Sequence, residues 1–377
     1  MTVILTISFI LLLLYYVSFL FKIKKGLKEI ESQKQSYGGN EFVSVVIPFR
    51  NESGTILENL RCLETQNIST DKYEVIYVDD NSDDDSVRKL KSSISKDNIF
   101  VYSVDNTNYN RAHKKRAIEL GIEKARGEII LLTDADCTNK TTWINTMLAE
   151  FSGNTGLVSG PVKFNPDKTL FAKLQQLEFA GLILSGAGLI GNKTPIICSS
   201  ANLAFRKSVF SEVGGYKDLM GLSSGDDELL MQKIASDTNY EVKFCFNKDA
   251  LVSTNPNENL EAFTQQRKRW ASKGLFYKNK GIVIQLSLIF LFYIGLIAQL
   301  FLGLFVDHIF FYSFVLSLLA KMLIEYSVVK KGVGILMEKI PLNLFLLAEL
   351  LHIPYIVYSA ISGAFGNFSW KGRELER

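Results

Sequence analysis

EIILLTDADC, residues 128–137, is the stretch that decides the fold of this chain. Its first six residues form a near-continuous apolar run, which is typical of a β-strand buried on both faces of a sheet. Strands of this kind occur in parallel sheets covered by helices, and such sheets bind ligands beyond the carboxyl ends of their strands. The run ends at Asp134 and Asp136, so we expect functional side chains at this edge of a sheet.

Three similar apolar runs precede this stretch, at residues 43–48, 74–78 and 99–104. Helical patterns lie between the runs, one ending near Gln66 and one covering residues 111–125. Strands that alternate with helices predict βαβ units and a mostly parallel sheet. The fold class expected for this part of the chain is therefore α/β.

Acidic side chains follow these strands and meet at one edge of the predicted sheet. Glu52 follows the first strand, Asp79 and Asp80 follow the second, and Asp134 and Asp136 follow the fourth. Because like charges repel at short range, we expect a positive group among them. Asp134 and Asp136 are two residues apart, so their side chains share a face. We expect no Cys or His to lie near the two carboxylates in space, so they form a hard oxygen site suited to Mg²⁺ or Mn²⁺, or else a solvated or helix-capping pair.

Membrane helices are expected at both ends of the chain. The sequence has 377 residues, of which 47% are hydrophobic, and its mean hydropathy of +0.12 is high for a soluble protein. Residues 3–21 are apolar, uncharged and long enough to cross a bilayer. Comparable runs occupy residues 281–306, 309–328 and 341–362. We therefore expect a membrane helix, a soluble domain, a group of transmembrane or interfacial helices and a short polar tail, over residues 1–21, 22–280, 281–366 and 367–377.

The distribution of charge predicts the orientation in the membrane. Four lysines within residues 22–28 directly follow the first apolar segment, and basic residues stay on the cytoplasmic side of a span. We therefore expect an integral membrane protein whose soluble domain is cytoplasmic, at the inner membrane of a bacterium. Three C-terminal crossings would place the tail outside, against its cations, so one segment is expected not to cross. Either residues 321–340 lie in the interface, or residues 341–362 are re-entrant or bent at Pro354.

Net charge and cysteine content argue against a nucleic-acid partner, a zinc site and a disulfide framework. The net charge is only +3, so no basic surface for a nucleic acid is indicated. The four cysteines are widely spaced, which predicts neither a zinc site nor a disulfide framework and fits a reducing compartment.

Two charged stretches in the soluble region are candidates for the site. RAHKKR, residues 111–116, begins a predicted helix. We expect some of its cations to reach phosphates and most to lie on a solvated face. SSGDDELL, residues 223–230, contains Asp226 and Asp227. These acids either occupy a first helical turn behind a serine N-cap, where the dipole favours them, or supply a general base for an acceptor hydroxyl.

QQRKRW, residues 265–270, lies on a predicted helix shortly before the second apolar segment. Arg269 has the geometry to bind a phosphate with two parallel hydrogen bonds, and Trp270 offers a flat apolar face for a sugar or a lipid. The alternative is that the stretch only sets membrane orientation and supplies an interfacial aromatic. Both interpretations can hold together.

Taken in order, these stretches resemble the family-2 glycosyltransferases of the GT-A fold. The matching stretches are VSVVIPFRNE, EVIYVDDNS, AHKKRAIELGIEKARGEIILLTDADC, SSANLAFRKSVFSEVGGYKD, SSGDDELL and QQRKRW. The resemblance covers roughly residues 41–275 and looks closest to the membrane-embedded branch that includes cellulose, chitin and hyaluronan synthases and ceramide glucosyltransferase. It implies a Rossmann-like nucleotide-diphospho-sugar transferase domain flanked by transmembrane helices.

The resemblance also implies roles for single residues. Asp80 would contact the nucleotide base, and Asp134 and Asp136 would hold the divalent cation, Mg²⁺ or Mn²⁺, on the donor diphosphate. Asp227 would be the catalytic base. Lys114 matches a donor-site lysine, although the residues at 113 and 119 depart from the family pattern around it. The other implied contacts are Gln266, Arg269 and Trp270 with the donor, and Asn202, Arg206, Asp226 and Trp270 with the acceptor.

The implied reaction is the metal-dependent, inverting transfer of a sugar from a nucleotide-sugar, with a UDP-sugar as the expected donor, to a lipid or a membrane-associated glycan. Two alternatives stay open: a processive polysaccharide synthase, and a membrane-anchored protein that binds nucleotide-sugars without turnover. The small number of spans favours a single transfer, whereas QxxRW is common in processive members. The identity of the sugar, the acceptor and the oligomeric state are not indicated by the sequence.

Overall fold

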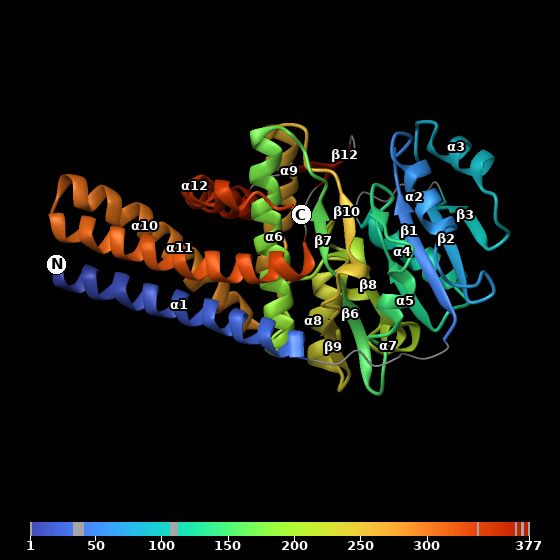
Figure 1. Ribbon diagram of the computed structural model, residues 1–377, viewed down its shortest axis with the longest axis horizontal. Helices are drawn as coiled ribbons and strands as arrows, with labels where there is room; N and C mark the ends of the chain where they lie inside the picture. The colour runs from blue at the N-terminus through green and yellow to red at the C-terminus, as the bar shows by residue number, and fades with distance from the viewer. Residues whose placement is uncertain are drawn as a thin grey trace.

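The structure of the protein is a computed structural model that describes residues 2–32, 41–105, 112–337, 339–365, 368–370 and 373–375. Its sheet domain is built on seven strands in the order β3-β2-β1-β4-β8-β6-β9 (Figure 1). Helices cover this sheet, and a group of long helices extends away from it. The α/β class and the flanking apolar helices expected from the sequence are both confirmed.

Four parallel strands form one half of the sheet. They are β1 (Val43–Phe49), β2 (Tyr73–Asp79), β3 (Ile99–Ser103) and β4 (Ile129–Leu132). β1 pairs in parallel with β2 and β4, and β2 pairs in parallel with β3. Every residue of β1, β2 and β4 is buried, which is why each strand reads as a near-continuous apolar run. These strands carry their carboxyl ends to one edge.

The second half of the sheet contains one reversed strand, β8. β8 runs antiparallel to both β4 and β6, and β9 closes the sheet in parallel with β6. A separate three-stranded sheet has the order β5-β10-β7. The bounds of these strands are Thr138–Asn139 for β5, Thr155–Ser159 for β6, Val162–Phe164 for β7, Leu203–Arg206 for β8, Glu241–Phe244 for β9 and Val252–Thr254 for β10.

Short helices alternate with these strands, as the sequence predicts. They are α2 (Ile56–Glu64), α3 (Ser86–Ser93), α4 (His113–Lys124), α5 (Trp143–Leu148), α7 (Lys207–Glu212) and α8 (Glu228–Asp237). α4 packs against β1 and β2 through its buried residues Ala117, Ile118 and Ile122. This packing fixes the start of α4, with Lys114, near the carboxyl edge of the parallel strands.

Among the described residues, four helices are long and apolar enough to cross a membrane: α1 (Thr2–Ser32), α10 (Lys280–Phe305), α11 (His308–Leu336) and α12 (Phe345–Phe365). In Figure 1, α1, α10 and α11 lie side by side and point away from the sheet domain. Two further helices, α6 (Leu170–Gly191) and α9 (Leu260–Ala271), stand between this bundle and the sheet. Together with α12, they form the layer between the sheet domain and the other apolar helices, which we call the floor.

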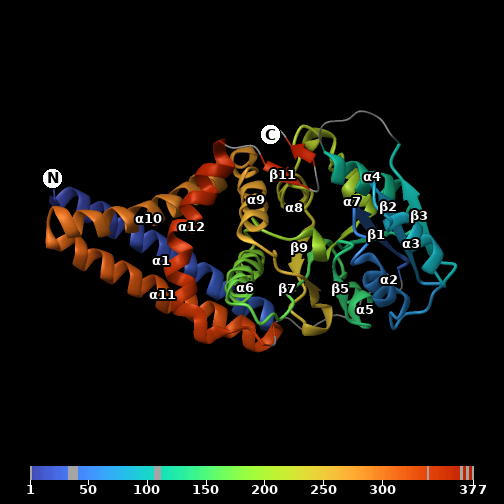
Figure 2. The same cartoon turned by 90° about the horizontal axis from the view of Figure 1, so that it is seen from above.

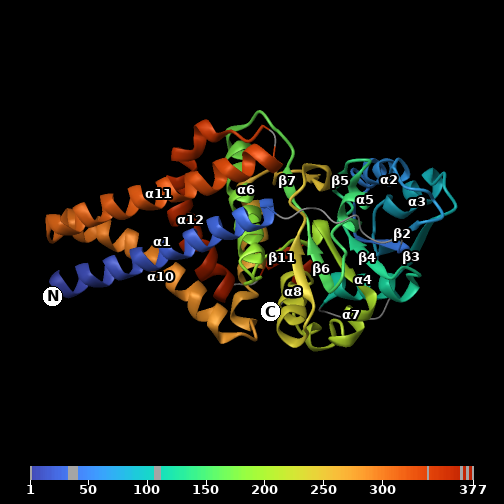
Figure 3. The same ribbon diagram turned by 60° about the horizontal axis from the view of Figure 1, so that its bottom comes forward.

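The orientation of α12 differs from that of the other apolar helices. Figure 2 shows α12 running across the axes of α1, α10 and α11, near the sheet domain, and Figure 3 shows the same crossing from another side. Pro354 lies inside α12. α12 packs against α9, α10 and α6, so it belongs to the floor of the sheet domain as much as to the bundle.

α1 and α11 extend beyond the apolar runs that predicted them. α1 continues past residue 21 because Ile23, Leu27 and Ile30 keep an apolar stripe that packs on α6. α11 continues to Leu336, through residues that we considered interfacial. Lys321 is fully buried inside the bundle, with its ammonium 2.8 Å from Glu325. The expectation of a separate interfacial segment from residue 321 is therefore wrong, because part of its charge is paired inside the bundle.

Candidate active site

The carboxyl ends of β1 and β2 lead into two loops that shape one side of the site. Asn51 and Asn81 have positive φ angles of 51° and 55°, a conformation that asparagine adopts more readily than most residues. Arg50 donates a hydrogen bond to the carbonyl oxygen of Asp80 at 3.0 Å. The Asp80 side chain is buried, with its carboxylate 3.8 Å from Nδ1 of His113 at the start of α4. Asp80 therefore lies at the expected edge, next to the start of α4.

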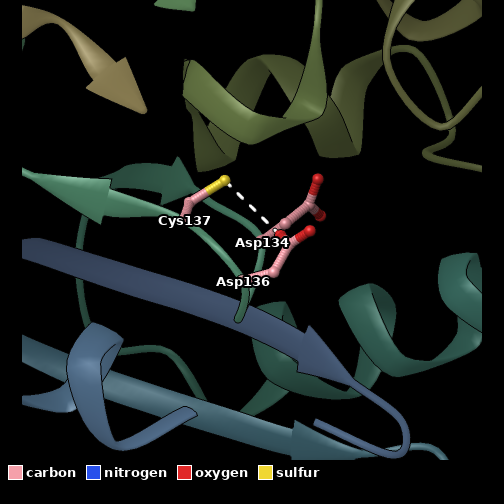
Figure 4. A group of neighbouring side chains, drawn as sticks. All are labelled: Asp134, Asp136 and Cys137. Carbon is pink, nitrogen blue, oxygen red and sulfur yellow. Dashed lines mark hydrogen bonds between the residues drawn. The ribbon is translucent and has the colours of Figure 1, made fainter. Parts of the chain in front are cut away.

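Asp134 and Asp136 lie directly after β4, and both are partly exposed. Figure 4 shows their carboxylates side by side, with the thiol of Cys137 next to Asp136. Potential ligand atoms of Asp134, Asp136 and Cys137 all lie within 4.8 Å of one another. Thr254 donates a hydrogen bond to Asp136 at 3.2 Å, which fixes that carboxylate from the small sheet.

The neighbouring thiol corrects the expectation that no cysteine lies near the acidic pair. Cys137 contacts Asp136 at 3.6 Å. Burial raises the pKa of the Cys137 thiol well above its usual value, and the two aspartates add to the rise. Because only the thiolate is a good metal ligand, the donor set of this site remains the two carboxylates. Two hard oxygen donors that retain access to solvent fit Mg²⁺ or Mn²⁺.

Lys114 connects the acidic pair after β4 with the acidic pair before α8. Its ammonium lies 2.7 Å from Asp134, 3.2 Å from Asp226 and 2.8 Å from the Ser200 hydroxyl. Burial alone would lower the pKa of Lys114, but Asp134 and Asp226 raise it above its usual value. Lys114 is therefore a fixed positive charge, and it is the cation that the clustered carboxylates require.

Asp226 and Asp227 differ in their surroundings although they are adjacent. The Asp226 side chain is almost fully buried, and its pKa would rise with burial if Lys114, Lys115 and Lys273 did not hold it well below its usual range. Asp227 is the N-cap of α8, with the Glu228 amide donating to it at 2.7 Å. The helix therefore begins one residue after the acidic pair, so the expected serine N-cap is wrong.

Two lysines at this site were not recognised from the sequence. Lys115 was expected to be solvated, but it is buried and donates to the carbonyl oxygens of Leu222 and Ser224, at 2.5 and 2.7 Å. Lys273 lies three residues beyond QQRKRW, with its ammonium 3.3 Å from Asp227 and 3.2 Å from Glu228. A lysine next to an apolar segment reads as a topology signal, and only the fold reveals the acids that it meets.

The helix α9 carries the QQRKRW stretch alongside this cluster. Arg269 is close enough to Lys114 to oppose its protonation and close enough to Asp226 to help lower the pKa of that carboxyl. The Gln266 side chain accepts a hydrogen bond from Asn257 at 2.9 Å. Trp270 stacks near Phe179, with ring centroids 6.0 Å apart. The structure therefore brings Arg269 to the acidic cluster, while Trp270 packs partly into the core.

Asn202 and Arg206 are not brought to an open acceptor pocket. Asn202 is fully buried, accepts a hydrogen bond from Trp143 at 3.0 Å, and donates to the carbonyls of Pro161 and Ala250 at 2.9 and 2.8 Å. This satisfies the whole side-chain amide. Arg206 donates to the carbonyl of Thr155 at 3.0 Å, at the far end of β8. Their expected acceptor contacts are corrected: Asn202 supports the core, and Arg206 lies at the opposite edge of the sheet. Arg111 lies outside the described residues.

A mostly parallel sheet with paired carboxylates at the carboxyl edge of its strands is the arrangement that we expected of a glycosyltransferase. Residues 44–214 match the family model described as Glycosyl transferase family 2. The chain therefore carries a glycosyl transferase family 2 domain.

Similarity to known proteins agrees with this family. Glycosyltransferase AglE of Haloferax volcanii is 28% identical over 205 residues, which are 54% of this chain and 64% of AglE. An undecaprenyl-phosphate 4-deoxy-4-formamido-L-arabinose transferase of Pseudomonas syringae is 37% identical over 101 residues, 26% of this chain and 29% of that protein. The chain thus spans less than two thirds of the length of these curated relatives.

The fold is shared with a solved structure over nearly the whole chain. Mannosyltransferase PcManGT from Pyrobaculum calidifontis, in complex with GDP-Man and Mn²⁺, superposes with a TM-score of 0.60 and 16% identity. The match covers 96% of this chain and 99% of that one. At this identity the likeness concerns the fold, including the helices that flank the sheet domain.

Proposed function

We propose that the protein transfers a sugar, with inversion, from a nucleotide-sugar to a lipid or a membrane-associated glycan at the membrane surface. The observation that carries this proposal is the position of Lys114, which contacts Asp134 after β4 and Asp226 before α8. One ammonium thus joins the acidic pair suited to a donor diphosphate with the acidic pair suited to an acceptor hydroxyl. A UDP-sugar is the donor that the resemblance favours.

The donor half of the site is formed by cations and carboxylates together. Asp134 and Asp136 would hold Mg²⁺ or Mn²⁺, and this ion would neutralise part of the charge of the diphosphate. Lys114 and Arg269 are further positive charges beside the same position, and they would stabilise the charge that develops on the leaving diphosphate. Asp80, which directly follows β2, would contact the nucleotide base.

The acceptor half of the site is assigned to the start of α8. Asp226 is surrounded by three lysines that disfavour its protonation, so it is the poorer base of the pair. Asp227 is somewhat more exposed and is oriented by the Glu228 amide and by Lys273. We assign Asp227 as the base that removes the proton of the acceptor hydroxyl during attack on the anomeric carbon. A single displacement at that carbon inverts its configuration.

A lipid acceptor is favoured by two observations. The curated relatives include transferases named for undecaprenyl phosphate, a membrane lipid. In addition, α9, which carries Trp270, packs against α12 beside the apolar bundle. We assign α12 to the membrane interface rather than to a crossing, because it runs across the other three helices. The sheet domain and the C-terminus would then lie on the same, cytoplasmic side.

A transfer assay with purified protein tests this proposal. The assay combines labelled UDP- or GDP-sugars, polyprenyl phosphate and Mn²⁺ in detergent, and it measures product length by chromatography. We expect one sugar on the lipid. A long polymer would instead establish the processive synthase, and donor binding without transfer or hydrolysis would establish the non-catalytic binding protein. Labelling of a cysteine introduced at the C-terminus, in sealed right-side-out vesicles, tests the topology, and labelling from the outside would contradict it.

A further inference from the structure

Arg267, the first of the three cations of QQRKRW, has no place in the donor site described above. Only 3% of its side chain is exposed, and it is enclosed by α6, α9 and α12. Its guanidinium lies 4.2 Å from the Trp270 ring and 4.4 Å from the Phe263 ring. The sequence offered membrane orientation as its only role, but a cation that sets orientation has no need to be buried.

The charge of Arg267 is balanced by one carboxylate, Glu178 of α6. Arg267 donates to Glu178 with Nε at 3.1 Å and also with Nη2, so the pair is bidentate. The hydroxyl of Tyr355 on α12 donates to Glu178 at 2.8 Å and accepts from Arg267 at 3.2 Å. Three side chains from three helices therefore form one closed hydrogen-bonded junction. A buried pair of this geometry fixes the positions of the elements that carry it.

The junction is continuous with the donor-site helix on one side. Arg267 also donates to the Gln266 side chain, and Asn257 donates to the same oxygen at 2.9 Å. Arg269 and Trp270 follow within one turn of α9. Any displacement of Arg267 therefore moves the residues that line the donor site, including the arginine that lies near Lys114.

On its other side the junction is continuous with the apolar bundle. α12 carries Glu349, which pairs with the fully buried Lys321 of α11. The same Lys321 lies 2.8 Å from Glu325, and Tyr16 of α1 donates to Glu325. α12 is thus held to the bundle by the ion pair of Glu349 with Lys321, and to α6 and α9 by the hydrogen bonds of Tyr355. Charged side chains inside an apolar bundle are costly unless they are paired with one another. Here the pairs hold α12 in place.

We infer that Glu178 is a positioning residue that couples the membrane-associated helix α12 to the donor-site helix α9. Through Arg267 and Tyr355 it sets the placement of Gln266, Arg269 and Trp270 relative to the acidic cluster. The inference rests on the proposed function for its kinetic consequence. Its structural consequence, a fixed environment for Trp270, is independent of that function.

Substitution Glu178→Gln tests the inference by two readouts. The first is ¹⁹F NMR of protein labelled with 5-fluorotryptophan, in which the Trp270 resonance is assigned with Trp270→Phe. We expect the Trp270 resonance to shift and the Trp143 resonance to stay unchanged, because Trp143 lies in the sheet core. The second readout is transfer: we expect kcat to fall at least tenfold while the Kd of the nucleotide-sugar changes less than threefold, since small misplacements weaken chemistry more than binding.

Two further variants keep the test decisive. Glu261→Gln makes the same chemical change on an exposed residue of α9, and it should leave both readouts unchanged. Glu178→Gln leaves Arg267 as a buried cation without its carboxylate, which should lower the melting temperature. Combining it with Arg267→Gln removes that cation, so the double variant should regain the melting temperature but not kcat or the Trp270 resonance. A wild-type Trp270 resonance and wild-type kcat in Glu178→Gln would overturn the inference. If the wild type shows no transfer, the proposed function fails, while the NMR result still decides the positioning role.

Discussion

Lys114 is the residue on which the organisation of the site depends. It contacts one acid from each of two motifs that are about ninety positions apart in the chain. The sequence predicted the acids after the strands and the need for a positive group among them. The family resemblance pointed to Lys114, but the residues alone did not show which of the neighbouring cations meets the acids, because adjacent positions of a helix face different directions. The fold selects Lys114 for the acids and Lys115 for two backbone carbonyls.

Lys114→Met should lower kcat about 100-fold or more, because the variant leaves Asp134 and Asp226 without their shared cation. The measurement is the rate of sugar transfer at saturating donor. Lys124→Met, at the opposite end of the same helix and more exposed, is the matched control and should retain wild-type activity. Equal activity of the Lys114 variant and the control would remove Lys114 from the site.

Glu228 predicts a pH dependence of stability. Burial raises the pKa of this carboxyl from 4.5 to about 7. The folded state therefore binds a proton at Glu228 more tightly than the unfolded state does. The contribution of this protonation to stability is complete below pH 4.5. That contribution is lost as the pH rises through about 7, by roughly 3 kcal/mol in the free energy of unfolding. Glu228→Gln should flatten the decline in melting temperature between pH 5 and 8, and an unchanged pH profile would contradict this assignment.

At the scale of elements, the contact between α1 and α6 joins the apolar bundle to the sheet domain. The helices approach at Gly26, Gly188 and Gly191, where a Cβ at Gly26 would lie 1.8 Å from the carbonyl oxygen of Gly188. The strands were predictable because a buried strand requires apolar residues at every position. This contact was not predictable, because a glycine in an apolar run gives no sign of which helix will cross it.

Gly26→Ala should destabilise this crossing by about 1–3 kcal/mol, because backbone atoms of α6 have no room to move away. The measurement is the melting temperature in detergent, together with the rate of proteolysis between α1 and β1. Gly334→Ala in α11 is the matched control, since a Cβ there meets nothing within 4 Å. The account of the crossing is wrong if both variants melt at the same temperature.

At the scale of the whole molecule, the sheet domain stands on a floor of α6, α9 and α12 beside the apolar bundle. The sequence predicted four apolar segments, one of which was expected not to cross the membrane. The crossing direction of α12 depends on contacts between distant charges, such as Lys321 with Glu349, and hydropathy does not reveal them. Arg267 likewise reads as a topology signal in the sequence, whereas the structure pairs it with Glu178, a residue distant in the chain.

The most direct test of the central claim is sugar transfer by Asp227→Asn compared with the wild type, measured with labelled donor and lipid acceptor. The account predicts that the variant binds the nucleotide-sugar with nearly wild-type affinity and transfers it at least a thousandfold more slowly, because it lacks the base. Transfer by Asp227→Asn at the wild-type rate would contradict the assignment of the acidic pair at α8 and, with it, the proposed mechanism.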